Sequence, residues 1–314
     1  MTLEQLKRFT VVVADSGDIE TARRYKPQDA TTNPSLILAA TKLDAYKGLL
    51  TEAVAYARSI DRQASTALDR LIVNFGVAYL KVIPGRISTE VDARLSHDTE
   101  GTIKKAKQLI SLYKDAGIGP ERVLIKVAGT WEGIQAVKVL ESEGIHCNVT
   151  LVFSLVQAVA AAEAGATLIS PFVGRISDWY TKHSGGVEHA EIVDPGVASV
   201  RNIYAYFRRH GYKTIVMGAS FRNVNQILDL AGIDYLTISP TLLEELAVLD
   251  KAVDPEAINR AGSNMPNDVQ IDKVSFKTQL ETDPMAFELL DDGIRRFDQD
   301  ASRLEALLGD LLTA

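Results

Sequence analysis

The feature that most constrains the fold is an alternation of short apolar segments with longer amphipathic segments along the 314-residue chain. Short apolar runs bounded by polar or glycine-bearing loops are typical of buried strands. We predict eight, at residues 10–13, 30–32, 87–91, 123–127, 148–152, 167–171, 214–217 and 235–238. Helices are predicted at residues 44–58, 99–116, 133–143, 155–164, 199–210 and 223–231. This alternation favours a parallel sheet with right-handed crossovers.

One further apolar segment, residues 71–75, has the composition of a strand but the spacing of a helix. Its apolar residues continue a helical period on both sides, at Leu68, Leu71, Ile72, Phe75, Tyr79 and Val82. We therefore predict a helix that runs to Pro84, where the ring would end it.

Eight strands with intervening helices favour a single (β/α)8 TIM barrel over residues 1–314, with additional N- and C-terminal helices. The C-terminal helix is predicted at residues 283–312, after a polar insertion at residues 250–275 to which the pattern assigns no role. An open, doubly wound sheet is the alternative. The lack of a GxGxxG turn after the first strand disfavours it.

Composition excludes several classes of protein. A hydrophobic fraction of 46% and a charged fraction of 24% are ordinary for a globular chain. The net charge of −7 argues against nucleic-acid binding. The single Cys147 excludes an internal disulfide and a CxxC metal site. Because no leader-like or membrane-length apolar segment is present, we expect no membrane association and a cytoplasmic location.

A lysine interrupts one of the apolar strands. Lys126 lies in the run Val-Leu-Ile-Lys-Val-Ala at residues 123–128. Lysine is almost never fully buried unless it is paired or functional. A desolvated amine loses basicity and becomes a nucleophile toward carbonyl carbon. The alternative is a lysine that extends its amine from the strand to solvent. The residues on the neighbouring strands are needed to distinguish the two interpretations.

Polar residues gather at the carboxyl ends of the predicted strands, where the active sites of parallel barrels lie. They are Asp15, Asn33, Glu90, Lys126, Asn148, Thr150, Ser170, Arg175, Ser220 and Arg222. Alternation along a strand puts Glu90 on one face with Ser88 and Asp92, and Asn148 on one face with Thr150. Because the outer face of a barrel packs on helices, these polar faces should point to the axis. Each buried polar group left unpaired costs about 1–3 kcal/mol, so we interpret the cluster as a site.

The cluster contains the groups that a lysine-based aldol reaction requires. A neutral Lys126 would attack a ketone, and two carboxyl groups from different strands, Asp15 and Glu90, could divide the acid and base steps. Asn33, Asn148 and Ser170 are suited to hydrogen-bond a polyhydroxylated ketone.

Two arginines are suited to bind an anionic end of the substrate. Arg175 and Arg222 follow the sixth and seventh strands, near the usual phosphate site of barrel enzymes. The loop at residues 218–223 leads directly into a predicted helix, whose amides would add to such a site. Solvated loop arginines are the alternative.

Two segments resemble the signature segments of the transaldolases. They are Asp-Ala-Thr-Thr-Asn-Pro-Ser-Leu-Ile at residues 29–37 and Ile-Lys-Val-Ala-Gly-Thr-Trp-Glu-Gly at residues 125–133, with supporting blocks at residues 84–94, 170–175 and 217–223. The resemblance covers nearly the whole chain. It implies a (β/α)8 barrel without metal or organic cofactor that moves a dihydroxyacetone unit between sugar phosphates of the pentose phosphate pathway. Many members are homodimers.

The resemblance also implies a role for each site residue. Lys126 would form the Schiff base, Glu90 with Thr150 would handle its water and proton, and Asp15 would act on the hydroxyl at the cleaved bond. The substrate would be held by the remaining residues: Thr31, Asn33, Asn148, Ser170 and Phe172 around the dihydroxyacetone part, and Arg175, Ser220 and Arg222 at the phosphate.

Two positions depart from the family pattern. Gly129 stands where serine is common, and Ser177 stands where leucine is common.

Two other functions stay open. One is a fructose 6-phosphate aldolase, although those enzymes are shorter and usually carry tyrosine in place of Phe172. The other is a non-catalytic phosphosugar-binding barrel, which the presence of Asp15, Glu90 and Lys126 together disfavours.

Overall fold

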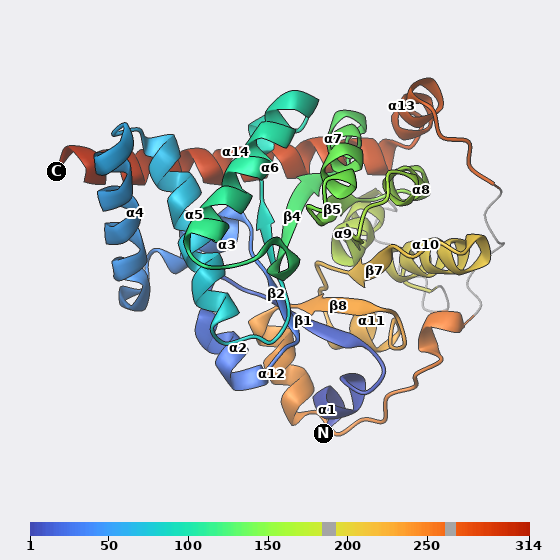
Figure 1. The fold of residues 1–314 in the computed structure, drawn as a ribbon. Helices are drawn as coiled ribbons and strands as arrows, with labels where there is room; N and C mark the ends of the chain where they lie inside the picture. Colours follow the sequence, from blue (N-terminus) through green and yellow to red (C-terminus); the bar gives the residue numbers. More distant parts are fainter. Residues whose placement is uncertain (184–192, 261–267) are drawn as a thin grey trace.

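The computed structural model describes residues 1–183, 193–260 and 268–314. Within them, eight parallel strands pair in chain order and close into a barrel, so the predicted (β/α)8 fold is confirmed (Figure 1). The strands are β1 (Val11–Asp15), β2 (Asp29–Thr31), β3 (Ile87–Glu90), β4 (Val123–Ala128), β5 (Cys147–Val152), β6 (Leu168–Pro171), β7 (Ile215–Gly218) and β8 (Tyr235–Ile238). Each lies within two residues of its predicted bounds.

Helices surround the barrel. In the chain, one α-helix precedes the first strand and three follow the last strand among the described residues. The α-helices are α1 (Thr2–Leu6), α2 (Ile19–Tyr25), α3 (Pro34–Ala40), α4 (Lys47–Ile60), α5 (Ala64–Leu80), α6 (Thr99–Asp115), α7 (Trp131–Ser142), α8 (Leu155–Glu163), α9 (Val173–His183), α10 (Pro195–His210), α11 (Val224–Leu228), α12 (Pro240–Val248), α13 (Lys273–Glu281) and α14 (Pro284–Thr313). Helix α5 confirms the helical interpretation of residues 71–75.

Several local predictions need correction. The helix predicted at residues 223–231 is the short α11, which ends at Leu228 before a turn at Gly232, whose φ is +93°. The predicted insertion 250–275 contains a 3₁₀ turn at Ala257–Asn259 and the start of α13, while residues 261–267 lie outside the described part. Asp92 does not continue the polar face of β3, because the strand ends at Glu90 and Asp92 pairs with Arg94.

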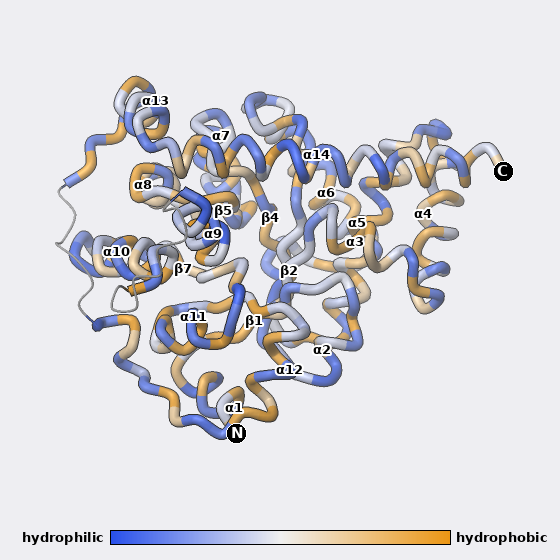
Figure 2. The backbone as a smooth tube through the Cα atoms, turned by 180° about the vertical axis from the view of Figure 1, so that it is seen from behind, coloured by the Kyte–Doolittle hydropathy of each residue, from blue (hydrophilic) through white to orange (hydrophobic). Residues whose placement is uncertain are grey.

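The interior of the barrel is apolar toward the amino ends of the strands. Val13, Leu124, Leu168 and Met217, each from a different strand, form a small core separate from the large one between strands and helices. In Figure 2, β4 and β5 carry hydrophobic colours, whereas the outer α4 alternates between hydrophobic and hydrophilic. The inner core is a floor above which the polar ends of the strands lie.

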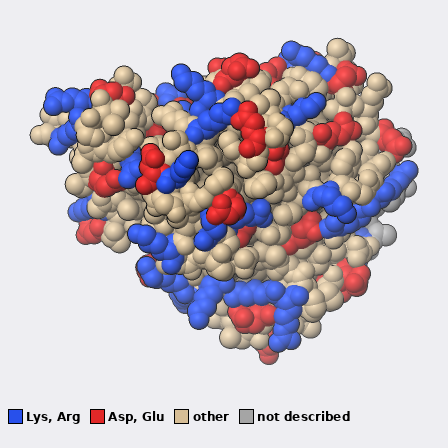
Figure 3. All heavy atoms as spheres, viewed as in Figure 1, with Lys and Arg blue, Asp and Glu red and all other residues tan. Residues whose placement is uncertain are grey.

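The surface carries charges of both signs. On the face seen in Figure 3, acidic side chains are interspersed with basic ones, and the chain has a net charge of −7. No helix in the described residues has both the length and the apolar character needed to cross a bilayer. The 30-residue α14 is amphipathic, with one buried stripe at Phe297, Ala301, Leu304 and Leu308.

Helix α14 crosses the molecule and reaches the strand ends (Figure 1). Ser35 Oγ donates to Asp300 Oδ2 at 2.5 Å, and Arg94 pairs with Glu305 at 3.0 Å. Close approach to β5 depends on Gly293, where an added Cβ would lie 2.7 Å from Leu151 Cδ2. The missing side chain thus sets how near α14 lies to the barrel.

We expect Gly293→Ala to destabilise the protein by about 1–2 kcal/mol, because the methyl group would force α14 from the buried Leu151. Denaturant unfolding measures the effect.

The matched control is Gly309→Ala in the same helix. A Cβ there meets only the Ala64 Cβ at 3.9 Å, so alanine should stabilise by about 0.5–1 kcal/mol through helix propensity. Equal effects of the two substitutions would contradict a packing role for Gly293.

Candidate active site

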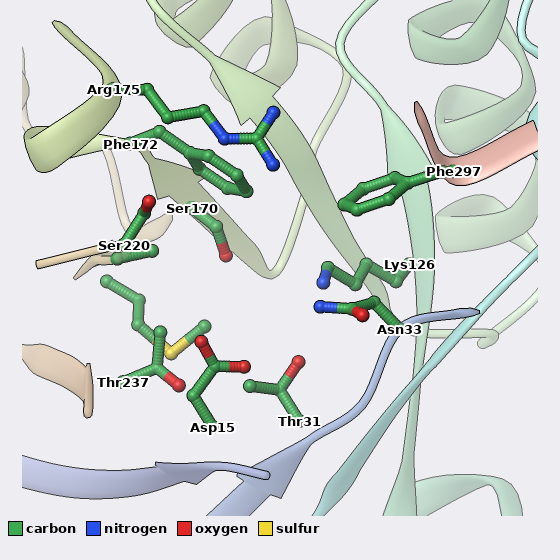
Figure 4. Close-up of a pocket in the computed structure, with 12 residues that line it drawn as sticks. Asp15, Thr31, Asn33, Lys126, Ser170, Phe172, Arg175, Ser220, Thr237 and Phe297 are labelled. Atoms are coloured by element: carbon green, nitrogen blue, oxygen red, sulfur yellow. The ribbon is translucent and has the colours of Figure 1, made fainter. Parts of the chain in front are cut away.

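A hollow of about 430 Å³, its open mouth included, lies at the carboxyl ends of the strands. Eight of the predicted site residues line it together: Asp15, Thr31, Asn33, Lys126, Ser170, Phe172, Arg175 and Ser220. Figure 4 shows their side chains converging from different strands and loops. A hollow of this size suits a small polar metabolite.

The ladder between strands places Lys126 at the base of the hollow. Parallel pairing aligns it with Glu90 of β3 and with Asn148 of β5. Its amine is buried and lies 3.5 Å from Glu90 Oε2 and 3.5 Å from the Thr32 carbonyl oxygen. The lysine thus does not extend to solvent, and the alternative considered from the sequence is excluded.

Two carboxyl groups flank the amine. Burial raises the pKa of both Asp15 and Glu90, although Lys126 and Arg175 partly offset this. Glu90 Oε2 has no hydrogen-bond partner among the described residues and does not line the main hollow, so it faces the amine from the side. Carboxyl groups that retain protons above their usual range are suited to proton transfer.

Asn148 lies behind the hollow and orients one of its lining residues. Ser170 Oγ donates to Asn148 Oδ1 at 2.7 Å, and Asn148 Nδ2 donates to Ser88 Oγ at 3.1 Å. This confirms the predicted inward faces of β3 and β5. Thr150 is also fully buried and outside the hollow, and its hydroxyl has no partner in the described part of the chain.

Asn33 is held by the helix that follows it rather than by a strand. β2 ends at Thr31, and Asn33 caps α3 by accepting the Leu36 N–H at 2.9 Å. With its oxygen engaged, the amide nitrogen points into the hollow near the Lys126 amine (Figure 4). The Thr31 hydroxyl beside it has no protein partner in the described residues.

The arginines lie at the outer side of the hollow. Arg175 lies over the Phe172 ring at 5.0 Å, and burial lowers its pKa, with the nearby Arg296 and Arg222 adding to the effect. Arg222 does not line the main hollow but an adjacent one, where it pairs with Asp178 at 2.8 Å. Its Nη1 reaches Ser220 Oγ at 3.3 Å, which links the two hollows.

Four lining residues were not among those predicted. Met217, Ala219, Thr237 and Phe297 complete the wall. The polar Thr237 sits near the carboxyl end of the predicted eighth strand, so the same alternation argument could have found it. The Phe297 ring lies 5.9 Å from the Lys126 amine and 5.8 Å from Arg175. It comes from the middle of α14, and no local sequence pattern indicates that this helix will pass over the hollow.

We expect Asp15→Asn to gain stability over the wild type as pH rises. In the unfolded chain this carboxyl ionises near 3.8, whereas burial raises its pKa in the folded protein. As the pH rises through the folded-state pKa, ionisation of the buried Asp15 carboxyl lowers the free energy of unfolding of the wild type. The asparagine variant has no charge to bury and keeps its stability. Urea unfolding at about pH 4 and about pH 8 would measure the difference.

Asp254→Asn is the control with the opposite sign. The Glu256 N–H and then the Arg260 guanidinium lower the Asp254 pKa. That variant should lose stability relative to the wild type at neutral pH, and the loss should disappear as pH falls. If the difference in unfolding free energy between Asp15→Asn and the wild type does not change with pH, the proposed effect of burial on Asp15 is wrong.

Two comparisons with known proteins agree with this geometry. The model of the transaldolase/fructose-6-phosphate aldolase family matches residues 12–308. A transaldolase of Nostoc sp. strain PCC 7120 is 53% identical over an alignment that spans 321 positions and covers 99% of this chain and 96% of the relative. The chain belongs to the transaldolase/fructose-6-phosphate aldolase family.

Proposed function

We infer that the protein catalyses the transaldolase reaction of the pentose phosphate pathway. It moves a dihydroxyacetone unit from sedoheptulose 7-phosphate to glyceraldehyde 3-phosphate, which yields erythrose 4-phosphate and fructose 6-phosphate. The observation that carries this inference is the buried Lys126 amine, 3.5 Å from Glu90 at the base of a polar hollow. Its support is the 53% identity to a transaldolase over almost the full chain.

The first step is attack of the Lys126 amine on the ketone carbon of the donor sugar, which gives a carbinolamine. Loss of water then forms the Schiff base. We assign proton delivery to Glu90, because it faces the amine and burial raises its pKa. The unpartnered Thr150 hydroxyl would help to hold the released water.

The second step breaks the bond between C3 and C4 of the donor. Asp15 removes the proton from the C4 hydroxyl, the C4 carbonyl forms, and the electron pair of the broken bond moves into the iminium to give an enamine. The aldose phosphate then leaves. The enamine attacks the acceptor aldehyde, Asp15 returns its proton, and hydrolysis frees Lys126.

The other residues would hold the substrate along the hollow. Asn33, Thr31 and Ser170 point into the hollow (Figure 4), where we place the dihydroxyacetone part, and Asn148 would act through its hydrogen bond to Ser170. At the outer side, Arg175 and Ser220 would receive the phosphate.

Arg222 completes the proposed phosphate site from the adjacent hollow. Since it is already paired with Asp178, we expect it to bind phosphate by exchanging one anionic partner for another.

Release of free dihydroxyacetone, as in a fructose 6-phosphate aldolase, is the second candidate activity. The wall residue Phe172 supports transfer instead, because its ring packs edge-on against Phe153 at 5.6 Å and presents no hydroxyl to the hollow.

We also propose that the whole chain acts as one domain, that it forms a homodimer as many family members do, and that it is cytoplasmic. The buried free thiol of Cys147 is compatible with a reducing compartment.

Borohydride reduction in the presence of fructose 6-phosphate should attach one three-carbon adduct to Lys126, which peptide mapping would locate. Lys126→Ala should lose the adduct and about a thousandfold or more of the activity. Lys107→Ala, which removes an exposed amine paired with Glu143, should keep both.

Acceptor dependence separates the two candidate activities. With fructose 6-phosphate as donor, turnover should depend on added erythrose 4-phosphate as acceptor and should yield glyceraldehyde 3-phosphate and sedoheptulose 7-phosphate. Equally fast release of free dihydroxyacetone without acceptor would identify an aldolase, and an adduct on another lysine would refute the mechanism.

A further inference from the structure

The loop after β7 is held in an unusual backbone conformation next to the proposed phosphate site. Ser220, a hollow-lining residue, has a φ of +61°, which non-glycine residues rarely adopt. Such a conformation costs about 1–3 kcal/mol and persists only where the surroundings fix it. The Val173 N–H donates to the Ala219 carbonyl and the Gly174 N–H to the Ser220 carbonyl, each at 2.9 Å. The start of α9 thus fastens one side of the loop.

A buried glutamine fastens the other side. Gln226, in the first turn of α11, is 4% exposed and does not line the hollow. Its Oε1 accepts the Arg222 N–H at 2.8 Å, while its own N–H donates to Asn223 Oδ1 at 3.1 Å. The side chain therefore fixes the backbone of a proposed phosphate-binding residue without contact to the substrate.

The glutamine is itself oriented by two residues from other helices. Its Nε2 donates to Asp194 Oδ2 at 3.0 Å and to Ser177 Oγ at 3.1 Å. An ionised carboxylate only accepts hydrogen bonds, so Asp194 turns Nε2 toward itself and leaves Oε1 for the Arg222 N–H. Asp194 in turn accepts the Ser177 hydroxyl at 2.8 Å and caps α10 through the Val197 N–H at 2.9 Å.

We propose that Gln226 is a positioning residue for the phosphate end of the substrate, held in its working orientation by Asp194 and Ser177. The proposal rests on the assignment of the phosphate to Arg175, Ser220 and Arg222 made above. It gives a role to Ser177, one of the two departures from the family pattern, because a leucine there would offer no partner to the glutamine amide. Loss of the Gln226 oxygen would release the loop and weaken the binding of the phosphate group, while Lys126 and its carboxyl partners stay in place.

The test compares a phosphorylated with an unphosphorylated ligand at the same lysine. In Gln226→Leu, the half-saturating concentration of fructose 6-phosphate should rise about tenfold, which corresponds to about 1.4 kcal/mol and one lost hydrogen bond. The inhibition constant of inorganic phosphate as a competitive inhibitor should rise by a similar factor. Borohydride trapping of dihydroxyacetone on Lys126 should be unchanged, since this ketone has no phosphate.

Gln226→Glu separates loop positioning from general stability. Glutamate keeps the acceptor for the Arg222 N–H but places a second carboxylate beside Asp194, so the variant should unfold more easily. Its half-saturating concentration of fructose 6-phosphate should nevertheless stay within about twofold of the wild type, because the loop contact remains. If sugar phosphate binding instead follows stability across the two variants, the glutamine has only a structural role.

Gln157→Leu is the matched control for loss of a buried glutamine. Gln157 donates to the carbonyl oxygens of Gly129 and Leu151, at 2.8 Å and 3.0 Å, behind the ends of β4 and β5. The Gln157→Leu substitution should lower the stability of the protein and should change the binding of fructose 6-phosphate and the trapping of dihydroxyacetone by the same factor. Equal changes for both ligands in Gln226→Leu would overturn the proposal. A wild type that forms no adduct with dihydroxyacetone at Lys126 would instead overturn the proposed function.

Discussion

The parallel ladder of β3, β4 and β5 is the constraint on which the rest of the site depends. Its register brings Glu90, Lys126 and Asn148 to one level of the barrel axis. Since backbone hydrogen bonds across three strands fix that register, no side chain has to move to bring the proposed nucleophile together with its neighbours. A slip of one residue in any of these strands would turn the site residue of that strand outward into the helical layer.

The strands and most of the site could be predicted because both follow from periodicity. Alternation along β3 and β5 puts Ser88 and Asn148 on inward faces, and the structure joins them by a hydrogen bond. The sequence pattern did not reveal Phe297, because its place depends on how α14 crosses the barrel. It also did not separate the lining of the hollow from its support: Asn148 and Thr150 share a face with the site yet lie behind it. Depth along an axis is a tertiary property that alternation does not encode.

The site is maintained at some expense to the stability of the fold. Burial raises the pKa of Asp15 and Glu90, and hydroxyls of Thr31, Thr150 and Thr237 are buried without a protein partner in the described residues. Each of these groups would favour water over its present surroundings. The apolar floor beneath them and the continuous core outside the strands offset this cost and keep the groups in place.

The position of α14 in the chain separates one wall of the hollow from all the others. The strands that carry Lys126, Asp15 and Glu90 precede Phe297, which α14 supplies from near the C-terminal end of the sequence. Asp300 and Glu305 of the same helix contact Ser35 and Arg94, while the Phe297 ring lies 5.9 Å from the Lys126 amine. A substitution on α14 can therefore change the surroundings of the proposed nucleophile while every strand of the barrel keeps its sequence.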